Sequence, residues 1–366
     1  MNWTISRRRF LCHAVAMGTA GAGVGFLGAA AGAERAPQGS QPAVKSRPDV
    51  IVARGGYPGW PWIARTGPER LVCVFRDDSI HGFSPTGRAM IADSSDNGKT
   101  WAPARLIVDE PGVDDRNVAV APLPDGTLLV CYNTYTRQLV SRPMVIASKD
   151  GGATWGKPRL MADLDARTRG APVPLSSGEI LIPIYKAPGS GSLAAISRDG
   201  KSWQLAVVPD TAGFLGDEWA VVEVQKGRLV GIIRNSGARD GYFWKTESRD
   251  AGRTWSVPAR TNVRDARSTS PADLDLHGKT PVLTYADRRM ISVSMVTTRD
   301  PEFLTWDLDH RLPCYQYRPD GKPIADASYP VSVAVGPHRR LIVDYEIRAE
   351  GKWIAGYFVD LPKEWE

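Results

Sequence analysis

The stretch Ser94-Ser-Asp-Asn-Gly-Lys-Thr-Trp101 decides the fold, because it recurs along the chain. Its pattern, S-x-D-x-G-x-T-W, returns at 148–155 and 248–255. Two altered copies, at 197–203 and 298–306, are one residue shorter and one residue longer. The closing tryptophans fall at positions 101, 155, 203, 255 and 306, so successive copies lie 48 to 54 residues apart. A repeat of about fifty residues indicates an architecture built from similar units.

Each copy has the composition of a tight turn between two strands. Ser and Asp side chains accept hydrogen bonds from nearby backbone N–H groups, and Gly adopts the positive φ that such turns need. Apolar and polar residues alternate between the copies, for example at 70–75, 127–132 and 228–233, which predicts short strands. About four such strands fit into fifty residues, and four strands make one blade of a β-propeller.

A second pattern, a strand, a turn and another strand, recurs six times. The six units begin near residues 61, 117, 171, 219, 271 and 330, and we find no helical periodicity between residues 50 and 366. The sequence therefore predicts an all-β fold, a six-bladed β-propeller. A β-sandwich with unrelated turns is the alternative, and the five motifs in register argue against it.

The N-terminus has the features of an export signal. Ser6-Arg-Arg-Arg-Phe-Leu11 matches the twin-arginine pattern, an Ala- and Gly-rich run follows, and Ala31-Gly-Ala33 fits a cleavage site. We expect a twin-arginine signal peptide at 1–33, a flexible leader at 34–48 and the propeller domain at 49–366. The run is too poor in large apolar residues to span a membrane well. We therefore expect a periplasmic or secreted bacterial protein with no membrane anchor after signal cleavage.

Charge and cysteine content narrow the choice of partners. The net charge of +6 falls to about +3 without the three arginines of the signal, which gives no support to nucleic-acid binding. Outside the signal, Cys73, Cys131 and Cys314 form no C-x-x-C pair or Cys/His cluster. We expect Cys73 and Cys131 to be small buried residues, and we expect no metal and no cofactor, since phosphate-loop and dinucleotide motifs are also missing from the sequence. We also expect a monomer.

Charged and aromatic residues occupy the loops that a propeller would bring together at one end of its channel. They precede the inner strands or follow the second strands of the blades. They include Trp60, Asp115, Arg116, Arg167, Arg169, Glu218 and Tyr329 before the inner strands, and His81, Tyr185, Arg234, Arg288, Arg289 and Glu346 after the second strands. The arginine fork matches a carboxylate bidentately. This collection predicts a pocket for a glycan with a carboxylate-bearing sugar.

The repeated motif is identified as the Asp box, or BNR repeat, and the chain resembles the sialidase (neuraminidase) superfamily over nearly all of residues 50–366. The resemblance implies an exo-glycosidase that hydrolyses a terminal sugar of a glycoconjugate with retention. It implies that Tyr329 is the nucleophile and that Glu218 accepts the phenolic proton. Asp77 or Asp78 would be the acid/base residue, on the loop after the second strand of blade one.

The resemblance also implies a clamp for the substrate carboxylate. Arg234 and either Arg288 or Arg289 would form it, and Glu346 would steady an arginine. Sialidases take a further arginine from an F/Y-R-I-P stretch. The equivalent segment here, Gly55-Gly-Tyr-Pro-Gly-Trp-Pro61, has no arginine, which leaves Arg54 or Arg65 as a substitute from outside that position.

Three further candidates for substrate binding, His81, Asp115 and Arg116, are not typical of sialidases. They allow a sugar other than sialic acid, so two alternatives stay open. One is a polysaccharide lyase, or another glycosidase, acting on uronic-acid-containing glycans; in a lyase Tyr329 or His81 would abstract the proton α to the carboxylate. The other is a non-catalytic propeller that binds glycans.

Overall fold

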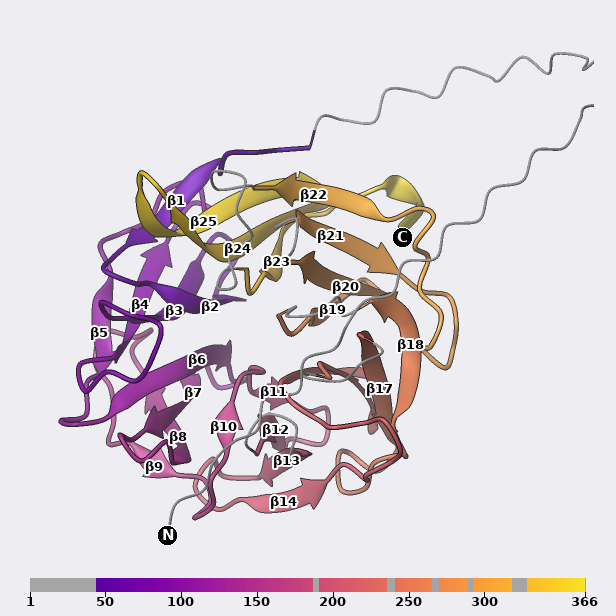
Figure 1. The fold of residues 1–366 in the computed structure, drawn as a ribbon, viewed down its shortest axis with the longest axis horizontal. Helices are drawn as coiled ribbons and strands as arrows, with labels where there is room; N and C mark the ends of the chain where they lie inside the picture. Colours follow the sequence, from indigo (N-terminus) through magenta and orange to yellow (C-terminus); the bar gives the residue numbers. More distant parts are fainter. Residues whose placement is uncertain are drawn as a thin grey trace, which may run out of the picture. The chain divides into compact units, whose positions relative to one another are not determined.

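Six four- or five-stranded antiparallel sheets surround a central axis, so the predicted six-bladed propeller is confirmed (Figure 1). The computed structural model describes residues 44–186, 191–235, 241–264, 270–288, 292–317 and 328–365. Each blade begins with its innermost strand. These innermost strands are the units that the sequence pattern located near residues 61, 117, 171, 219, 271 and 330.

The first three blades have the following strands. Blade one contains β2 (Gly59–Arg65), β3 (Leu71–Asp77), β4 (Arg88–Ser94) and β5 (Arg105–Val108). Blade two contains β6 (Asp114–Pro122), β7 (Leu128–Tyr135), β8 (Ser141–Ser148) and β9 (Arg159–Leu160). Blade three contains β10 (Arg167–Thr168), β11 (Val173–Pro174), β12 (Ile180–Tyr185), β13 (Ser192–Ser197) and β14 (Gln204–Val207). Here the innermost strand is divided in two, because β10 and β11 both pair with β12.

The other three blades follow the same order. Blade four contains β15 (Trp219–Gln225), β16 (Arg228–Ile233), β17 (Tyr242–Ser248) and β18 (Ala259–Arg264). Blade five contains β19 (Asp273–His277), β20 (Thr280–Asp287), β21 (Ser292–Thr297) and β22 (Leu312–Gln316). Blade six contains β23 (Val331–Gly336), β24 (Arg339–Arg348), β25 (Gly351–Asp360) and β1 (Val50–Arg54). The 3-10 helix η1 (Lys363–Trp365) is the one helical element among the described residues.

The two ends of the described domain meet in blade six. β1 pairs antiparallel with β25, with Val50 opposite Gly356 and Arg54 opposite Trp353. The first strand of the domain is therefore the outermost strand of its last blade, and this pairing closes the ring (Figure 1). Closure holds the first and last blades next to each other. The six inner strands can therefore converge on one axis.

The Asp boxes connect the third strand to the fourth strand of their blades. In blade two, Ser148 Oγ accepts a hydrogen bond from Gly152 N at 2.8 Å, and Asp150 Oδ1 accepts one from Thr154 N at 2.9 Å. Blades one and four repeat the same bonds. Gly152 needs its positive φ of 85° to place its N–H under the serine. These turns lie at the opposite end of the blades from the predicted pocket, because the third strand runs away from it.

Apolar side chains fill the spaces between neighbouring blades. One cluster joins Leu71 and Phe75 of blade one to Leu341 and Val343 of blade six. Another joins blades four and five. Cys73, Cys131 and Cys314 are free and buried within such clusters, which the sequence had predicted for Cys73 and Cys131, and burial raises the pKa of Cys131 to about 12. The blades thus hold each other by packing.

The predicted signal peptide and most of the predicted leader lie outside the described residues. Those two segments therefore stay sequence-based predictions. Among the described residues, no helix has both the length and the apolar character needed to cross a membrane.

We expect Ser148→Ala to lower the free energy of unfolding by about 1–3 kcal/mol, because it leaves the buried Gly152 N–H without an acceptor. Urea denaturation measures the change. The matched control is Ser95→Ala in the equivalent turn of blade one, where the serine is exposed, and we expect a change below about 0.5 kcal/mol. Equal effects of the two substitutions would show that the Asp-box bond does not stabilise the fold.

Candidate active site

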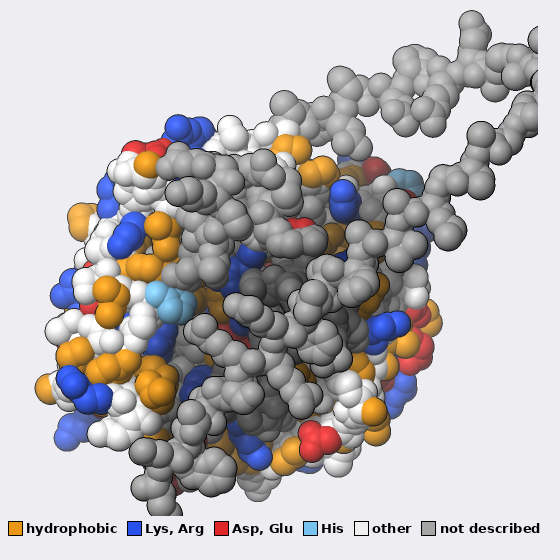
Figure 2. Space-filling view, in the orientation of Figure 1, with side chains coloured by type: hydrophobic (Ala, Val, Ile, Leu, Met, Phe, Trp, Pro, Cys, Tyr) orange, Lys and Arg blue, Asp and Glu red, His pale blue; other side chains and the backbone are white. Residues whose placement is uncertain are grey.

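One end of the channel holds a polar cavity of about 310 Å³. Inner strands begin there and second strands end there, so residues from different blades meet. The cavity is lined by Trp60, His81, Arg116, Asn117, Asn133, Tyr135, Arg167, Tyr185, Asp217, Glu218, Arg234 and Tyr329. The face drawn in Figure 2 carries Lys and Arg side chains at its rim and toward its centre.

Tyr329 is held at the entrance to the innermost strand of blade six. Its backbone N donates to Asp344 Oδ1 at 2.5 Å, and Ser328 Oγ donates to Asp344 Oδ2 at 2.7 Å. Ser328 has a positive φ of 68°, which is uncommon for a residue with a side chain. The buried carboxyl of Asp344 therefore fixes a strained turn that directs the tyrosine ring into the cavity.

The Tyr329 hydroxyl lies between a carboxylate and a guanidinium. Its Oη is 3.2 Å from Glu218 Oε2 and 3.2 Å from Arg234 Nη1. Glu218 and Arg234 also form an ion pair, and Arg234 N donates to Glu218 O at 2.9 Å. The hydroxyl can therefore donate its proton to Glu218 while accepting a hydrogen bond from Arg234. The tyrosine and the glutamate are 8% and 3% exposed, so water competes little for these contacts.

Arginines surround the Tyr329 ring. The guanidinium carbons of Arg169 and Arg288 lie 5.0 and 5.6 Å from the ring centroid. Burial, followed by the charge of Glu218, raises the pKa of Tyr329 to about 12, whereas Arg234, Arg288 and Arg169 act in the opposite direction. The phenol is neutral at neutral pH, and the arginines favour the charge that it gains when its proton leaves.

The opposite wall of the cavity alternates arginines with aromatic rings. The Arg116 guanidinium lies 4.4 Å from the Trp60 ring centroid and 5.2 Å from that of Tyr135. Arg167 lies 5.8 Å from the centroid of the same Tyr135 ring. Bulges in β2 and β6, with Trp60 and Asn117 at φ of 51° and 56°, orient this wall.

His81 lines the same cavity from the loop after β3. Its Nδ1 lies 3.1 Å from Tyr57 Oη, and its ring packs edge-on against Trp60. Burial lowers the pKa of His81 to about 4, and the charges of Arg116, Arg76 and Arg288 add to this effect. His81 is therefore neutral at neutral pH.

The two aspartates predicted as acid/base residues lie outside the lining of the cavity. Asp78 Oδ2 accepts a hydrogen bond from the fully buried Arg76 at 2.6 Å, and Arg76 also binds both oxygens of Asp114 at 2.6 and 2.9 Å. Burial alone would raise the pKa of Asp78, but hydrogen bonds and the charge of Arg76 outweigh it and lower the pKa. Asp77 pairs instead with Arg88 at 3.3 Å.

Other predicted residues also have partners away from the cavity. Glu346 is buried and steadies an arginine, but that arginine is Arg348, whose Nε lies 2.7 Å from Glu346 Oε2. Trp353 Nε1 donates to the same oxygen at 3.0 Å. Arg54, on the outer strand β1, covers the Trp353 ring at 5.0 Å and does not line the cavity. Arg289 lies outside the described residues.

Asp115 is buried beside the cavity but does not line it. Its Oδ2 accepts a hydrogen bond from Glu110 N at 2.8 Å. Burial raises the pKa of Asp115 to about 7, and the nearby charges of Glu110, Asp109 and Asp114 add to this effect. This carboxyl therefore holds its proton in the fold at pH values where it is ionised in the unfolded chain.

The structure adds lining residues that the sequence did not single out as site residues. Tyr135 ends β7, and Asn117 donates from Nδ2 to Tyr185 Oη at 3.3 Å. The loop pattern had included Tyr185 and Arg167 without assigning them a role. Tyr135 lies three residues beyond the end of the expected strand at 127–132. The sequence pattern did not indicate that the second strand of blade two extends this far.

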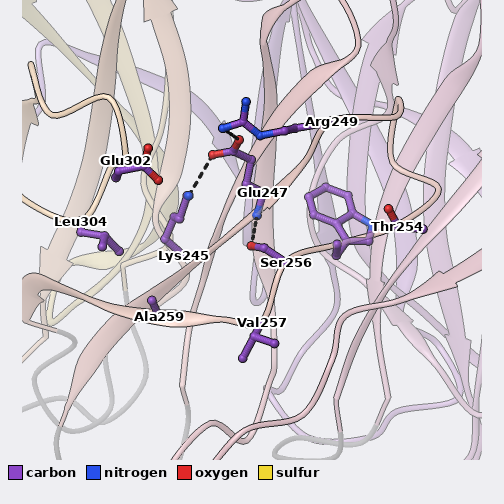
Figure 3. Close-up of a pocket in the computed structure, with 10 residues that line it drawn as sticks. Lys245, Glu247, Arg249, Thr254, Ser256, Val257, Ala259, Glu302 and Leu304 are labelled. Carbon is purple, nitrogen blue, oxygen red and sulfur yellow. Dashed lines mark hydrogen bonds and ion pairs between the residues drawn. The ribbon is translucent and has the colours of Figure 1, made fainter.

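Other cavities lie away from this centre. Figure 3 shows a cavity of about 540 Å³ beside the Asp box of blade four. Its charges compensate one another, because Glu247 binds Lys245 at 3.0 Å and Arg249 at 2.7 Å. Arg228 binds the same carboxylate at 3.0 Å. We therefore interpret this cluster as structural. Among the described residues, no group of three or more His, Cys, Asp or Glu is arranged to hold a metal ion.

The fold and the cavity define a propeller of the sialidase type. A family profile, the BNR repeat-like domain, matches residues 117–336, and the chain belongs to this family.

Solved structures agree on the fold. A protein of unknown function from Dyadobacter fermentans matches with a TM-score of 0.74 at 20% identity, over 88% of this chain and 100% of that one. The NanB sialidase from Streptococcus pneumoniae matches with a TM-score of 0.65 at 10% identity, over 86% and 70% of the two chains. Trypanosoma rangeli sialidase in complex with sialic acid matches with a TM-score of 0.61 at 16% identity, over 90% and 60%. At these identities the likeness concerns the fold alone.

We expect Asp115→Asn to stabilise the protein above pH 7. The folded-state pKa of about 7 exceeds the value near 3.9 of an unfolded chain. The wild type therefore loses stability as pH rises between these values, while the amide does not. At pH 8 the gain should be on the order of 2–4 kcal/mol, shrinking toward pH 4.

Urea denaturation at several pH values measures this difference. The control is Asp163→Asn, whose side chain is 82% exposed, and its effect should not change with pH. A difference between wild type and Asp115→Asn that is constant from pH 4 to pH 8 would contradict the raised pKa.

Proposed function

We propose that this protein is a retaining exo-glycosidase that removes a terminal, carboxylate-bearing sugar from a glycan. The observation that carries the proposal is the contact of Tyr329 Oη with Glu218 Oε2 and Arg234 Nη1, both at 3.2 Å. A nucleophile, its base and an orienting cation thus meet in one cavity, although Tyr329 lies 95 positions from Arg234 and 111 positions from Glu218 in the sequence.

A tyrosine suits an anionic sugar as nucleophile. A carboxylate nucleophile would repel the substrate carboxylate, whereas a neutral phenol does not. In the proposed first step, the Tyr329 oxygen bonds to the anomeric carbon while its proton passes to Glu218, and the leaving oxygen departs with a proton from the acid Asp77. Water then attacks the anomeric carbon and gives a proton to Asp77, the tyrosyl bond breaks, and Glu218 returns its proton to the phenol.

Arginines balance the charge during both steps. Arg234 and Arg288 lie beside Tyr329 and can hold the substrate carboxylate, as the sequence suggested. Arg169, which stacks on the ring, replaces the arginine missing from the segment before Pro61 as a nearby positive charge. Its Nε and Nη1 are buried and make no hydrogen bond to the described residues, which leaves them for an anionic ligand.

Asp77 remains the proposed acid for the leaving oxygen. Asp78 is held by Arg76 with a lowered pKa, which makes it a poor proton donor. Asp77 has one carboxylate oxygen, Oδ1, that is buried and without a hydrogen bond to the described residues. To act, its side chain has to leave Arg88, which is 47% exposed, and turn toward the cavity.

A second candidate function, a lyase acting on uronic-acid-containing glycans, is favoured by one observation. Neutral His81 lines the cavity, whereas neither predicted acid does. A neutral imidazole can accept the proton α to a carboxylate. A lyase would release an unsaturated product that absorbs in the ultraviolet, and hydrolysis would not.

We expect Tyr329→Phe to lower kcat for a 4-methylumbelliferyl glycoside of an acidic sugar by roughly a thousandfold or more, since the nucleophilic oxygen is lost. Sialic acid and uronic acid glycosides are to be compared by fluorescence. The control is Tyr242→Phe, a half-buried tyrosine at the start of β17 under Arg260, which should retain activity. Unchanged turnover in Tyr329→Phe would contradict the proposal.

We expect Asp77→Asn to slow the cleavage of an unactivated oligosaccharide by about 100-fold while leaving the methylumbelliferyl glycoside much less affected. A good leaving group departs without protonation, whereas a sugar hydroxyl needs an acid. Rates are compared by chromatography of the released sugar. Asp78→Asn is the paired variant and should instead lower stability through Arg76. Equal slowing of both substrates by Asp77→Asn would exclude it as the acid.

A further inference from the structure

Two of the cations near Tyr329 and in the adjacent loop are compensated by carboxylates. Arg234 forms an ion pair with Glu218. Arg76 binds both oxygens of Asp114, at 2.6 and 2.9 Å, and lies fully buried. Paired charges of this kind have little attraction left for a ligand. Apart from Arg169, whose buried N–H groups are left for the first anion, further positive charge without a close carboxylate lies on the wall that carries Trp60 and Tyr135.

Arg116 is weakly paired. Its nearest carboxylate oxygen is Asp114 Oδ2 at 3.7 Å, and that oxygen already accepts a hydrogen bond from Arg76. Its Nη2 donates to the backbone oxygen of His81 at 3.0 Å, which orients the guanidinium without neutralising it. The side chain is 13% exposed and lines the cavity.

Arg167 is weakly paired as well. The nearest carboxylate oxygen, Asp165 Oδ1, lies 4.0 Å from Nη1, and Asp165 already accepts a hydrogen bond from Ser141 N at 2.8 Å. Arg167 Nη1 is buried and makes no hydrogen bond to the described residues. A buried cationic N–H without an acceptor is unfavourable unless a ligand supplies one.

The two guanidinium groups contact the same aromatic ring. They lie 5.2 and 5.8 Å from the centroid of Tyr135, and both line the cavity that Tyr329 and Glu218 line. His81 is neutral and therefore adds no charge to this wall. The ring keeps the guanidinium planes in place by cation–π contact, so their N–H groups are pre-organised for a planar or tetrahedral anion.

We propose that Arg116 and Arg167 form a second anion subsite, so that the cavity selects glycans carrying two anionic groups, one at Tyr329 and another, a carboxylate or a sulfate, at Tyr135. The assignment of the first anion rests on the proposed function. The second subsite is a matter of binding and can be tested without turnover.

The experiment is calorimetric titration of Tyr329→Phe, which binds without cleavage. Three disaccharides with the same backbone are compared: one with a single uronic carboxylate, one with an added sulfate and one with a second carboxylate. We expect at least one dianionic ligand to bind roughly tenfold or more tightly than the monoanionic one. In an Arg167→Met background this preference should disappear, while the affinity for the monoanionic ligand changes little.

Two further variants keep the test decisive. Arg167→Lys retains the charge without the fork and should restore part of the preference. Arg159→Met, an exposed arginine on the outer strand of blade two, should leave the preference unchanged. Thermal unfolding shows whether each variant is folded.

Equal affinities for all three disaccharides would overturn the second subsite, as would no binding of either dianion up to millimolar concentration. An equal loss for monoanionic and dianionic ligands in Arg167→Met would also overturn it. Failure of the proposed function looks different: it is a dianion preference that depends on Arg167, in a wild-type protein that cleaves no glycoside.

Discussion

The pairing of β1 with β25 is the contact on which the rest of the structure depends. It joins the beginning of the domain to its last blade and so closes the ring. Glu218 belongs to blade four and Tyr329 to blade six, and blade five separates these two blades in the sequence. Their 3.2 Å contact exists because a closed ring holds all inner strands around one axis. The proposed reaction therefore depends on closure of the ring.

The Asp boxes made the fold predictable, because their hydrogen bonds are local and leave a fixed spacing in the sequence. The meeting of Tyr329, Glu218 and Arg234 was predictable for a similar reason, since equivalent positions in different blades converge. The partners of charged side chains were not. Arg76 could have bound any of several nearby aspartates, and its choice of Asp114 and Asp78 depends on burial and loop geometry. The spacing of residues in the sequence does not indicate which of these aspartates Arg76 binds.

The cavity joins two walls of different character. Beside Tyr329, Glu218 and Arg234 form an ion pair, and in the proposed mechanism Glu218 receives the phenolic proton. Around Tyr135 the arginines are held by aromatic rings and have distant carboxylates. One wall is thus suited to chemistry and the other to recognition. The charged loop residues that the sequence predicts at one end of the channel therefore form two groups, one around Tyr329 and one around Tyr135, and not a single cluster.

The most direct test of the reactive centre is covalent trapping. A fluorinated acidic glycosyl fluoride reacts with a retaining enzyme to leave a slow-turning glycosyl adduct, which peptide mass spectrometry locates. The account predicts a mass increase of one fluorosugar on the peptide that contains Tyr329, with none in Tyr329→Phe. An adduct on a carboxylate such as Glu218, or cleavage of glycosides without any adduct on Tyr329, would contradict it.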